Sequence, residues 1–140
     1  PKATNLNLAY NIVDGNGALE PCSTAPSAPC PPSTTNGRGF IMYRNAANNT
    51  FHNGIVSIFQ GVANGYAAVY CQALPGNQVN DSLIYQAQGG ITNIGCAGTG
   101  DISGDPLYVD RANHDYRLAP GSPAAALMGT YAQAVPGPRV

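Results

Sequence analysis

The feature that most limits how this chain folds is the shortness of its regular segments, which Gly, Asn and Pro interrupt every few residues. Residues 5–15, NLNLAYNIVDG, place Leu, Tyr and Ile at alternate positions against Asn and Ala. A period of two is that of a half-buried β-strand. Helices draw heavily on Glu and Lys, and the sequence has a single residue of each. The sequence therefore predicts an all-β protein with many turns.

Several later segments have the same character, since each is short, rich in β-branched or aromatic residues and bounded by turn formers. They are residues 39–45, 48–61, 65–72, 81–88, 90–96, 105–110 and 114–120. One helix is expected at residues 122–129, SPAAALMG. Ser122 would be its N-cap, Pro123 would stand in the first turn, and Gly129 would end it.

Length and charge limit the classes of function. The 140 residues make one domain with a modest core. The net charge is −1, so nothing draws the chain to nucleic acid or to an anionic membrane. No apolar run approaches the ~18 residues of a membrane span. The chain begins at Pro1 without a signal peptide, and we expect either a removed leader or a longer parent chain.

The cysteines indicate the compartment. Cys22, Cys30, Cys71 and Cys96 form no CxxC motif, so zinc ribbons and thioredoxin-like redox sites are disfavoured. An even number favours disulfides, and hence an extracellular or cell-surface protein. Three pairings are open, of which we favour Cys22–Cys30 with Cys71–Cys96. The first two cysteines lie in residues 20–37, a proline-rich stretch without periodicity that we expect to be an inserted loop.

A weak and irregular internal repeat indicates stacked coils. Asn or Asp precedes a strand-like segment at Asn11, Asn49, Asp81 and Asn93, with unequal steps between them. Loops of unequal length inserted between repeating coils would produce such steps. Stacked coils align equivalent polar side chains, whose amides then hydrogen-bond along a ladder.

Three stretches resemble a known family. NNTFHNGIVSIFQG (48–61) and NDSLIYQAQGGITNIG (80–95) are similar to coils of right-handed parallel β-helix proteins, the pectate-lyase-like group. GDISGDPLYVDRANHDYRLAPGSPA (100–124) resembles the closing segment of secreted and surface members. The resemblance implies a short solenoid, a right-handed parallel β-helix, over residues 1–140 or as the C-terminal part of a longer one. A small disulfide-stabilised β-sandwich is the alternative, because periodicity does not separate parallel from antiparallel strands.

The resemblance also implies how the ends are treated. A coil stack leaves unpaired edges and apolar surface at both ends. Residues 122–140 would form the C-terminal cap. Residues 1–18 show no cap, which implies either that more chain lies upstream or that other protein chains pack there end to end, as a homo-oligomer or a larger assembly. Cys71 and Cys96, 25 residues apart, would lie on neighbouring coils, where a bridge is geometrically reasonable.

The family's enzymes act on acidic polysaccharides, but their catalytic motifs are missing from this sequence. A hydrolase needs two carboxylates across the scissile bond. Before the terminal segment the acidic residues are Asp14, Glu20 and Asp81, far apart in sequence. The sequence therefore indicates no self-contained active site.

Carboxylates in the terminal segment raise the question of calcium. The weak candidate ligands are Asp101, Asp105, Asp110 and Asp115. Their order does not match an EF-hand loop, and we favour a turn role for each. No other cofactor is expected. The eight tyrosines are expected to fill core edges more often than to stack on sugar rings.

These observations favour an extracellular or cell-surface protein with a structural or assembly role, whose partners are other protein chains. The alternative is a carbohydrate-binding or polysaccharide-cleaving protein whose active residues lie upstream. That alternative adds polysaccharide as a partner, and it rests on the resemblance alone.

Overall fold

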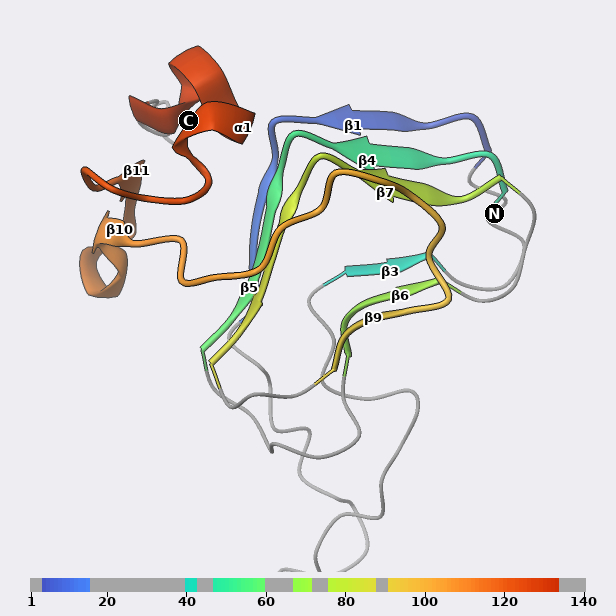
Figure 1. Cartoon of the computed structure of the whole chain (residues 1–140), viewed down its shortest axis with the longest axis horizontal. Coiled ribbons are helices and arrows are strands. Elements are labelled where there is room, and N and C mark those ends of the chain that lie inside the picture. The colour runs from blue at the N-terminus through green and yellow to red at the C-terminus, as the bar shows by residue number, and fades with distance from the viewer. Residues whose placement is uncertain are drawn as a thin grey trace, which may run out of the picture.

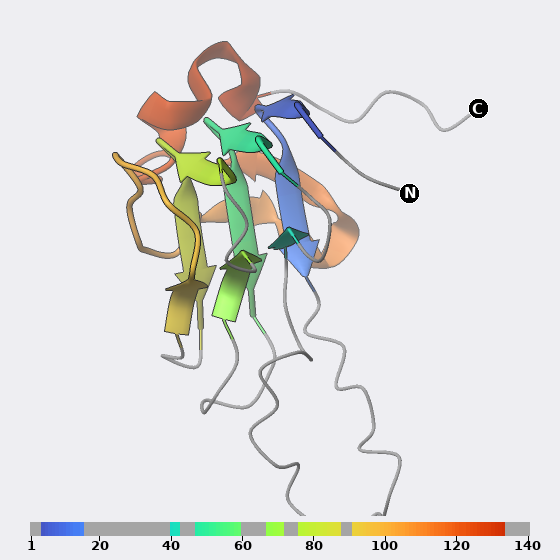
Figure 2. The same ribbon diagram turned by 90° about the vertical axis from the view of Figure 1, so that its right-hand side faces the viewer.

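The computed structural model describes residues 4–15, 40–42, 47–59, 67–71, 76–87 and 91–133. In these residues the chain makes three passes, and each pass gives one strand to each of three parallel sheets (Figure 1). The sheets have the strand orders β1–β4–β7, β2–β5–β8 and β3–β6–β9. Figure 2 shows the three passes side by side in chain order.

Every strand of these sheets is short. The first pass holds β1 (Asn7–Ala9), β2 (Ile12–Gly15) and β3 (Phe40–Met42), the second β4 (Thr50–His52), β5 (Ile55–Ile58) and β6 (Ala67–Cys71), and the third β7 (Gln78–Asn80), β8 (Leu83–Gln86) and β9 (Ile91–Ile94). Their β-branched and aromatic residues suit a pleated surface that is packed on one or both faces. The segments expected from the sequence therefore become strands, and β7 is the strand that the sequence does not predict.

The passes are in register, so the corners between the sheets lie over one another. β1 pairs with β4, and β4 with β7, without a shift. The corner that follows is a left-handed residue in each pass, at Tyr10 (φ 56°), Asn53 (φ 49°) and Asp81 (φ 46°). Asn and Asp adopt this conformation readily, whereas Tyr does so rarely. This corner divides residues 5–15 into two strands, where the alternation predicts one.

The main apolar core lies between the inner faces of the three sheets. Its buried members include Met42, Phe51, Val56, Ile58, Val69, Val79 and Ile84. They come from strands of all three sheets, so this core forms only when every sheet is in place. Gly54 has no side chain for a steric reason, because a Cβ atom there would overlap the ring of Phe51.

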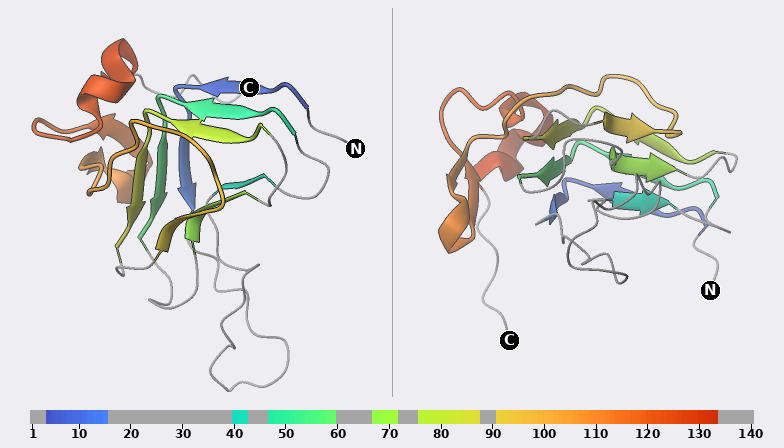
Figure 3. Two further views of the ribbon diagram at one scale, coloured as in Figure 1. Left: turned by 45° about the vertical axis from the view of Figure 1, so that its right-hand side comes forward. Right: turned by 90° about the horizontal axis from the view of Figure 1, so that it is seen from below.

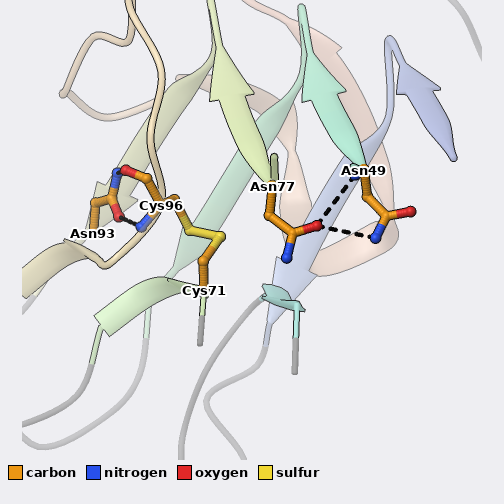
Figure 4. Close-up of a disulfide and its surroundings, with 5 residues drawn as sticks. All are labelled: Asn49, Cys71, Asn77, Asn93 and Cys96. Carbon is orange, nitrogen blue, oxygen red and sulfur yellow. Dashed lines mark hydrogen bonds between the residues drawn. A yellow bond between two sulfur atoms is a disulfide. The ribbon is translucent and has the colours of Figure 1, made fainter. Parts of the chain in front are cut away.

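A buried amide ladder joins successive passes (Figure 4). Asn77 Oδ1 accepts hydrogen bonds from the backbone N–H of Asn49, at 3.1 Å, and from Asn49 Nδ2, at 3.0 Å. Asn49 Oδ1 in turn accepts from the backbone N–H of Leu6, at 3.0 Å. Both Asn side chains are buried. A ladder of the expected kind is present, but Asn77 is not among the residues of the irregular repeat found in the sequence.

The disulfide Cys71–Cys96 is present, so this part of the predicted pairing is confirmed. Cys71 ends β6, Cys96 follows β9, and the two strands are neighbours in one sheet. Asn93 holds the Cys96 backbone from both sides, accepting from its N–H at 3.2 Å and donating to its carbonyl at 3.3 Å (Figure 4). Cys22 and Cys30, with all of residues 20–37, lie outside the described residues.

The C-terminal segment packs on the outer face of the β2–β5–β8 sheet, away from the main core (Figures 1 and 3). Its elements are β10 (Tyr108–Asp110), the 3₁₀ turn η1 (Arg111–Asn113), β11 (Asp115–Leu118), α1 (Ala125–Met128) and the 3₁₀ turn η2 (Gly129–Gln133). β10 and β11 form an antiparallel hairpin. Ile55 and Leu83 of the sheet pack against Leu118, Ala124 and Met128 in a second buried cluster.

The stack of passes continues past β9 in irregular form. Ala97 and Ile102 bridge to Gln78 and Leu83 of the third pass. The described part of the expected cap, residues 122–133, lies on the side of the β2–β5–β8 sheet, and residues 134–140 are outside the described residues.

The predicted helix exists but is shorter than expected, since α1 spans Ala125–Met128. Ser122 does not cap it, because its Oγ accepts from the Ala124 N–H, at 3.2 Å, and donates to the Pro106 carbonyl, at 2.6 Å. Gly129 ends the helix as expected. Ser122 therefore ties α1 to the loop before β10.

The all-β prediction is confirmed, but the finer prediction is not. The described strands form three small, open parallel sheets and one hairpin, and a β-helix solenoid is not confirmed by them. The alternative of a β-sandwich is also wrong, because sandwich sheets are antiparallel and these three are parallel.

The amide ladder gives a first test. Replacing Asn77 by Ala removes the acceptor of two buried donors on Asn49. We expect Asn77→Ala to lower the free energy of unfolding by about 2 kcal/mol, measured by urea denaturation. Asn7→Ala is the control, because Asn7 is exposed in β1 and should lose little. Equal losses in the two variants would contradict a stabilising ladder.

The disulfide gives a second test. It joins residues 25 apart in sequence, and closing such a loop restricts the unfolded chain. We expect the double variant Cys71→Ala/Cys96→Ala to lose about 3 kcal/mol in the same urea experiment on oxidised protein. A loss below about 0.5 kcal/mol would show that the bond adds nothing to the stacking of β6 on β9.

Candidate functional site

A buried carboxylate, that of Asp14, joins the β2–β5–β8 sheet to the C-terminal segment. The register places Asp14 of β2 beside Ser57 of β5. Asp14 Oδ1 accepts from Ser57 Oγ at 3.1 Å, and Oδ2 accepts from Arg111 Nε at 2.7 Å and from Tyr116 Oη at 3.2 Å. The Asp14 side chain is 5% exposed and that of Arg111 is 24% exposed. The carboxylate of Asp14 in β2 thus links the neighbouring strand β5 to η1 and β11 of the C-terminal segment.

Tyr108 completes this group, which we call the Asp14 cluster: Asp14, Ser57, Tyr108, Arg111 and Tyr116. Tyr108 Oη lies 3.1 Å from Ser57 Oγ. Because the single hydroxyl proton of Ser57 goes to Asp14, Tyr108 is the donor in this contact. Burial raises the pKa of Tyr108, and burial followed by the charge of Asp14 raises the pKa of Tyr116. Both phenols therefore stay protonated and donate at ordinary pH.

A shallow hollow of about 210 Å³ lies beside the Asp14 cluster. Its lining residues are Phe59, Asp105, Leu107, Tyr108 and Arg111. The guanidinium carbon of Arg111 lies 4.2 Å from the centroid of the Phe59 ring, a cation–π contact. The rings of Phe59 and Tyr108 are 6.2 Å apart. The hollow therefore combines aromatic and aliphatic walls with one guanidinium and one carboxylate.

The four weak calcium candidates each have a local role. Asp101 and Asp105 each accept a backbone N–H, at 2.9 and 2.8 Å. Asp110 caps η1, and Asp115 forms an ion pair with Arg117. In the ranges that the structure describes, no three His, Cys, Asp or Glu side chains are grouped to hold a metal ion.

A second aromatic group is exposed where η2 meets the first corner. The rings of Tyr10 and Tyr131 stack at 4.6 Å, and Tyr10 is 41% and Tyr131 52% exposed. The His52 ring meets Tyr10 edge-on at 6.4 Å. Asn53 Nδ2 donates to the Leu127 carbonyl at 3.1 Å, which fixes the orientation of the Asn53 amide. The Oδ1 atom of Asn53 therefore faces His52 and accepts from His52 Nδ1, at 2.8 Å. In the neutral ring, Nε2 is then the acceptor nitrogen.

The sequence did not reveal the Asp14 cluster. Asp14 and Arg111 are 97 residues apart, and no local spacing links them. One signal was available: Asp14 stands two residues after Ile12, so the two side chains share one face of the strand. A carboxylate on an apolar face needs a buried partner, but the sequence does not say which one.

These features define a class: an all-β protein of stacked parallel passes, with a C-terminal segment held on one sheet by a buried carboxylate. A scan against protein-family models matches residues 5–133 to the family described as disaggregatase related, and the chain belongs to this family. Searches of the curated proteins and of the solved structures find no match. Among the described residues, no helix has the length and apolar character that crossing a membrane requires.

The family match corrects the resemblance drawn from the sequence. The chain is not assigned to the pectate-lyase-like group, because the matching model is that of the disaggregatase-related family. The short Asn-rich turns and strands that carried the resemblance are real, but they are features of stacked parallel strands in general and do not identify one family.

The Asp14 cluster gives a third test. In Asp14→Asn the side chain keeps its size but loses the charge that pairs with Arg111. We expect a loss of about 2 kcal/mol in the free energy of unfolding, because an Arg that has lost its buried partner is left uncompensated. The control is Asp115→Asn, which breaks an ion pair whose Arg117 side chain is 42% exposed and should cost far less. Similar losses in both variants would contradict an anchoring role for Asp14.

Proposed function

We propose that this chain is a rigid extracellular or cell-surface module with a structural or assembly role, which pairs with further strands at the edge formed by β1 and β2. One observation carries the proposal: β1 and β2 are the outermost strands of their sheets in the part of the chain that the structure describes. Sheet edges present unpaired backbone groups and are templates for pairing with another chain.

The hydrogen bonds between β1 and β4 show which backbone groups of β1 face away from β4, toward a possible partner strand. Leu6 and Tyr10 use their backbone groups toward β4, since the Thr50 N–H donates to Leu6 and the Tyr10 N–H donates to His52. Alternate residues of a strand turn their backbone groups to opposite edges, so Asn7 and Ala9 face outward. Asn11 Nδ2 donates to the Ala9 carbonyl at 2.9 Å, which leaves Asn7 as the central outward position.

The proposed partner is a further parallel pass, which would pair with β1 and β2 and come from another copy of this chain or from a neighbouring chain. Parallel pairing is supported by the existing stack, in which three passes already add in register. Contacts of this head-to-tail kind extend into larger assemblies when they do not close. The disulfide Cys71–Cys96 supports an oxidising, extracellular compartment.

The fourth test concerns association. We expect light scattering to show assemblies larger than a single chain, whose fraction rises with concentration. Asn7→Pro should reduce association, because proline removes the outward N–H while β1 keeps its bonds to β4. Asn7→Ala keeps that N–H and is the matched control. A strictly monomeric protein at every concentration, or equal association in both variants, would overturn the proposal.

Carbohydrate binding is a second candidate function. The observation that favours it is the exposed stack of Tyr10 on Tyr131 beside His52. Aromatic side chains with a polar edge suit ligands that are apolar on one face and hydroxylated at the rim. The left-handed Tyr10 adds support, since backbone strain at a bulky residue is often kept at binding sites.

A further inference from the structure

We propose that the strand partner of the edge formed by β1 and β2 is a second copy of this chain, which pairs with that edge through its residues 97–102. The inference rests on the proposed function, association through this edge, and it names the partner and the segment that the partner uses.

Residues 97–102, which we call the fourth pass, lie at the end of the row of passes opposite to β1 and β2 (Figure 2). The bridges to the third pass, Ala97 to Gln78 and Ile102 to Leu83, are parallel and keep one constant separation in sequence. Gly100 takes the corner position and is left-handed, at φ 77°, as the corner residues of the other three passes are. The chain therefore adds a short further pass in register with the third.

At the corner, a backbone N–H of each pass donates to a carbonyl of the next pass. The donors and acceptors are Tyr10 and His52, Asn53 and Asn80, and Asp81 and Thr99, at 3.2, 3.3 and 2.9 Å. Gly100 holds the equivalent donor position in the fourth pass, so its N–H points away from the third pass. Ala9 is the first-pass equivalent of His52, and its carbonyl in a second copy would accept this N–H. The bond that the Ala9 carbonyl already accepts from Asn11 Nδ2 leaves its second lone pair for Gly100.

After the corner, the hydrogen bonds run in the other direction, from each pass back to the pass before it. The donors and acceptors are Ile55 and Asn11, Leu83 and Gly54, and Ile102 and Ser82, each at 2.9 Å. Ile12 is the equivalent donor of the first pass, because it pairs with Ile55. Its acceptor would be the Asp101 carbonyl of a second copy, since Asp101 precedes Ile102 as Asn11 precedes Ile12. The two ends of the row thus offer each other matching donors and acceptors.

The side chains at the two ends also match. Ile12, Ile55, Leu83 and Ile102 are equivalent residues of the four passes and form an apolar column. Ile55 and Leu83 are fully buried, whereas Ile102 is 37% exposed at the end of the column. A second copy would place its Ile102 over Ile12, which removes apolar surface of both residues from water.

Charge does not oppose this contact. Residues 7–12 carry no charged side chain, and residues 97–102 carry one, that of Asp101. Like charges that face each other are a main cause of rejected partners, and the two segments form no such pair. Because one sequence supplies both halves of the contact, the purified chain alone is sufficient to form it.

The experiment mixes two variants, each with one end blocked, and measures their association by light scattering. Asn7→Pro removes the outward N–H of β1 and leaves the fourth pass intact. Ile102→Lys places a charge at the end of the apolar column and leaves β1 and β2 intact. We expect each variant alone to associate about tenfold more weakly than the unaltered chain. An equimolar mixture should form pairs that contain one copy of each variant, because one intact contact remains between them.

Val109→Lys is the matched control for Ile102→Lys. Val109 is an apolar residue of β10, is 49% exposed and belongs to neither end of the row, so this variant should associate like the unaltered chain. A second measurement needs no variant. Hydrogen exchange at the Ile12 and Gly100 amides, followed by NMR, should slow as the concentration of the unaltered chain rises, because both N–H groups become hydrogen-bonded.

The outcomes separate this inference from the proposed function. Association that Asn7→Pro weakens and Ile102→Lys leaves unchanged would overturn the fourth pass as the partner segment and leave edge pairing in place. An equimolar mixture without pairs would overturn it in the same way, as would slowed exchange at Ile12 with unchanged exchange at Gly100. If Ile102→Lys does not fold, the exchange measurement on the unaltered chain decides. A chain that is monomeric at every concentration would overturn both the inference and the proposed function.

Discussion

The structure depends on one constraint: equivalent residues of successive passes must lie over one another at the spacing of hydrogen-bonded strands, about 4.8 Å. The pairings of β1, β4 and β7 and of β2, β5 and β8 run without a shift. A displacement of one residue would turn every inward side chain outward. The buried amides of Asn49 and Asn77 reinforce this register, because each meets its partner only when the passes are aligned.

The same register creates the candidate site. It places Asp14 beside Ser57 on the outer face of the β2–β5–β8 sheet, where a carboxylate would otherwise face apolar neighbours. Arg111 and Tyr116 of the C-terminal segment supply the missing donors. The hairpin is thereby fixed in position, and the segment before β10, with Asp105 and Leu107, lines the hollow beside it.

Local patterns in the sequence predict much of this fold. Alternation and turn residues predict the all-β class and most of the strands, and the cysteine spacing is compatible with the disulfide between β6 and β9. The corner at Tyr10 is missed, because alternation continues through it and Tyr is an unusual left-handed residue. β7 is missed because its three residues, Gln78–Asn80, carry one apolar side chain. Asp14 and Arg111 are missed as a pair, because only the folded chain brings them together.

The stacking of the three passes is tested most directly by measuring scalar couplings across backbone hydrogen bonds in solution. Each such coupling shows which N–H donates to which carbonyl. Stacked parallel passes predict couplings from the Thr50 N–H to the Leu6 carbonyl, from Gln78 to Asn49 and from Leu83 to Gly54. Couplings between strands that are adjacent in sequence, in the alternating pattern of antiparallel pairs, would contradict the three-pass architecture and the Asp14 cluster that rests on it.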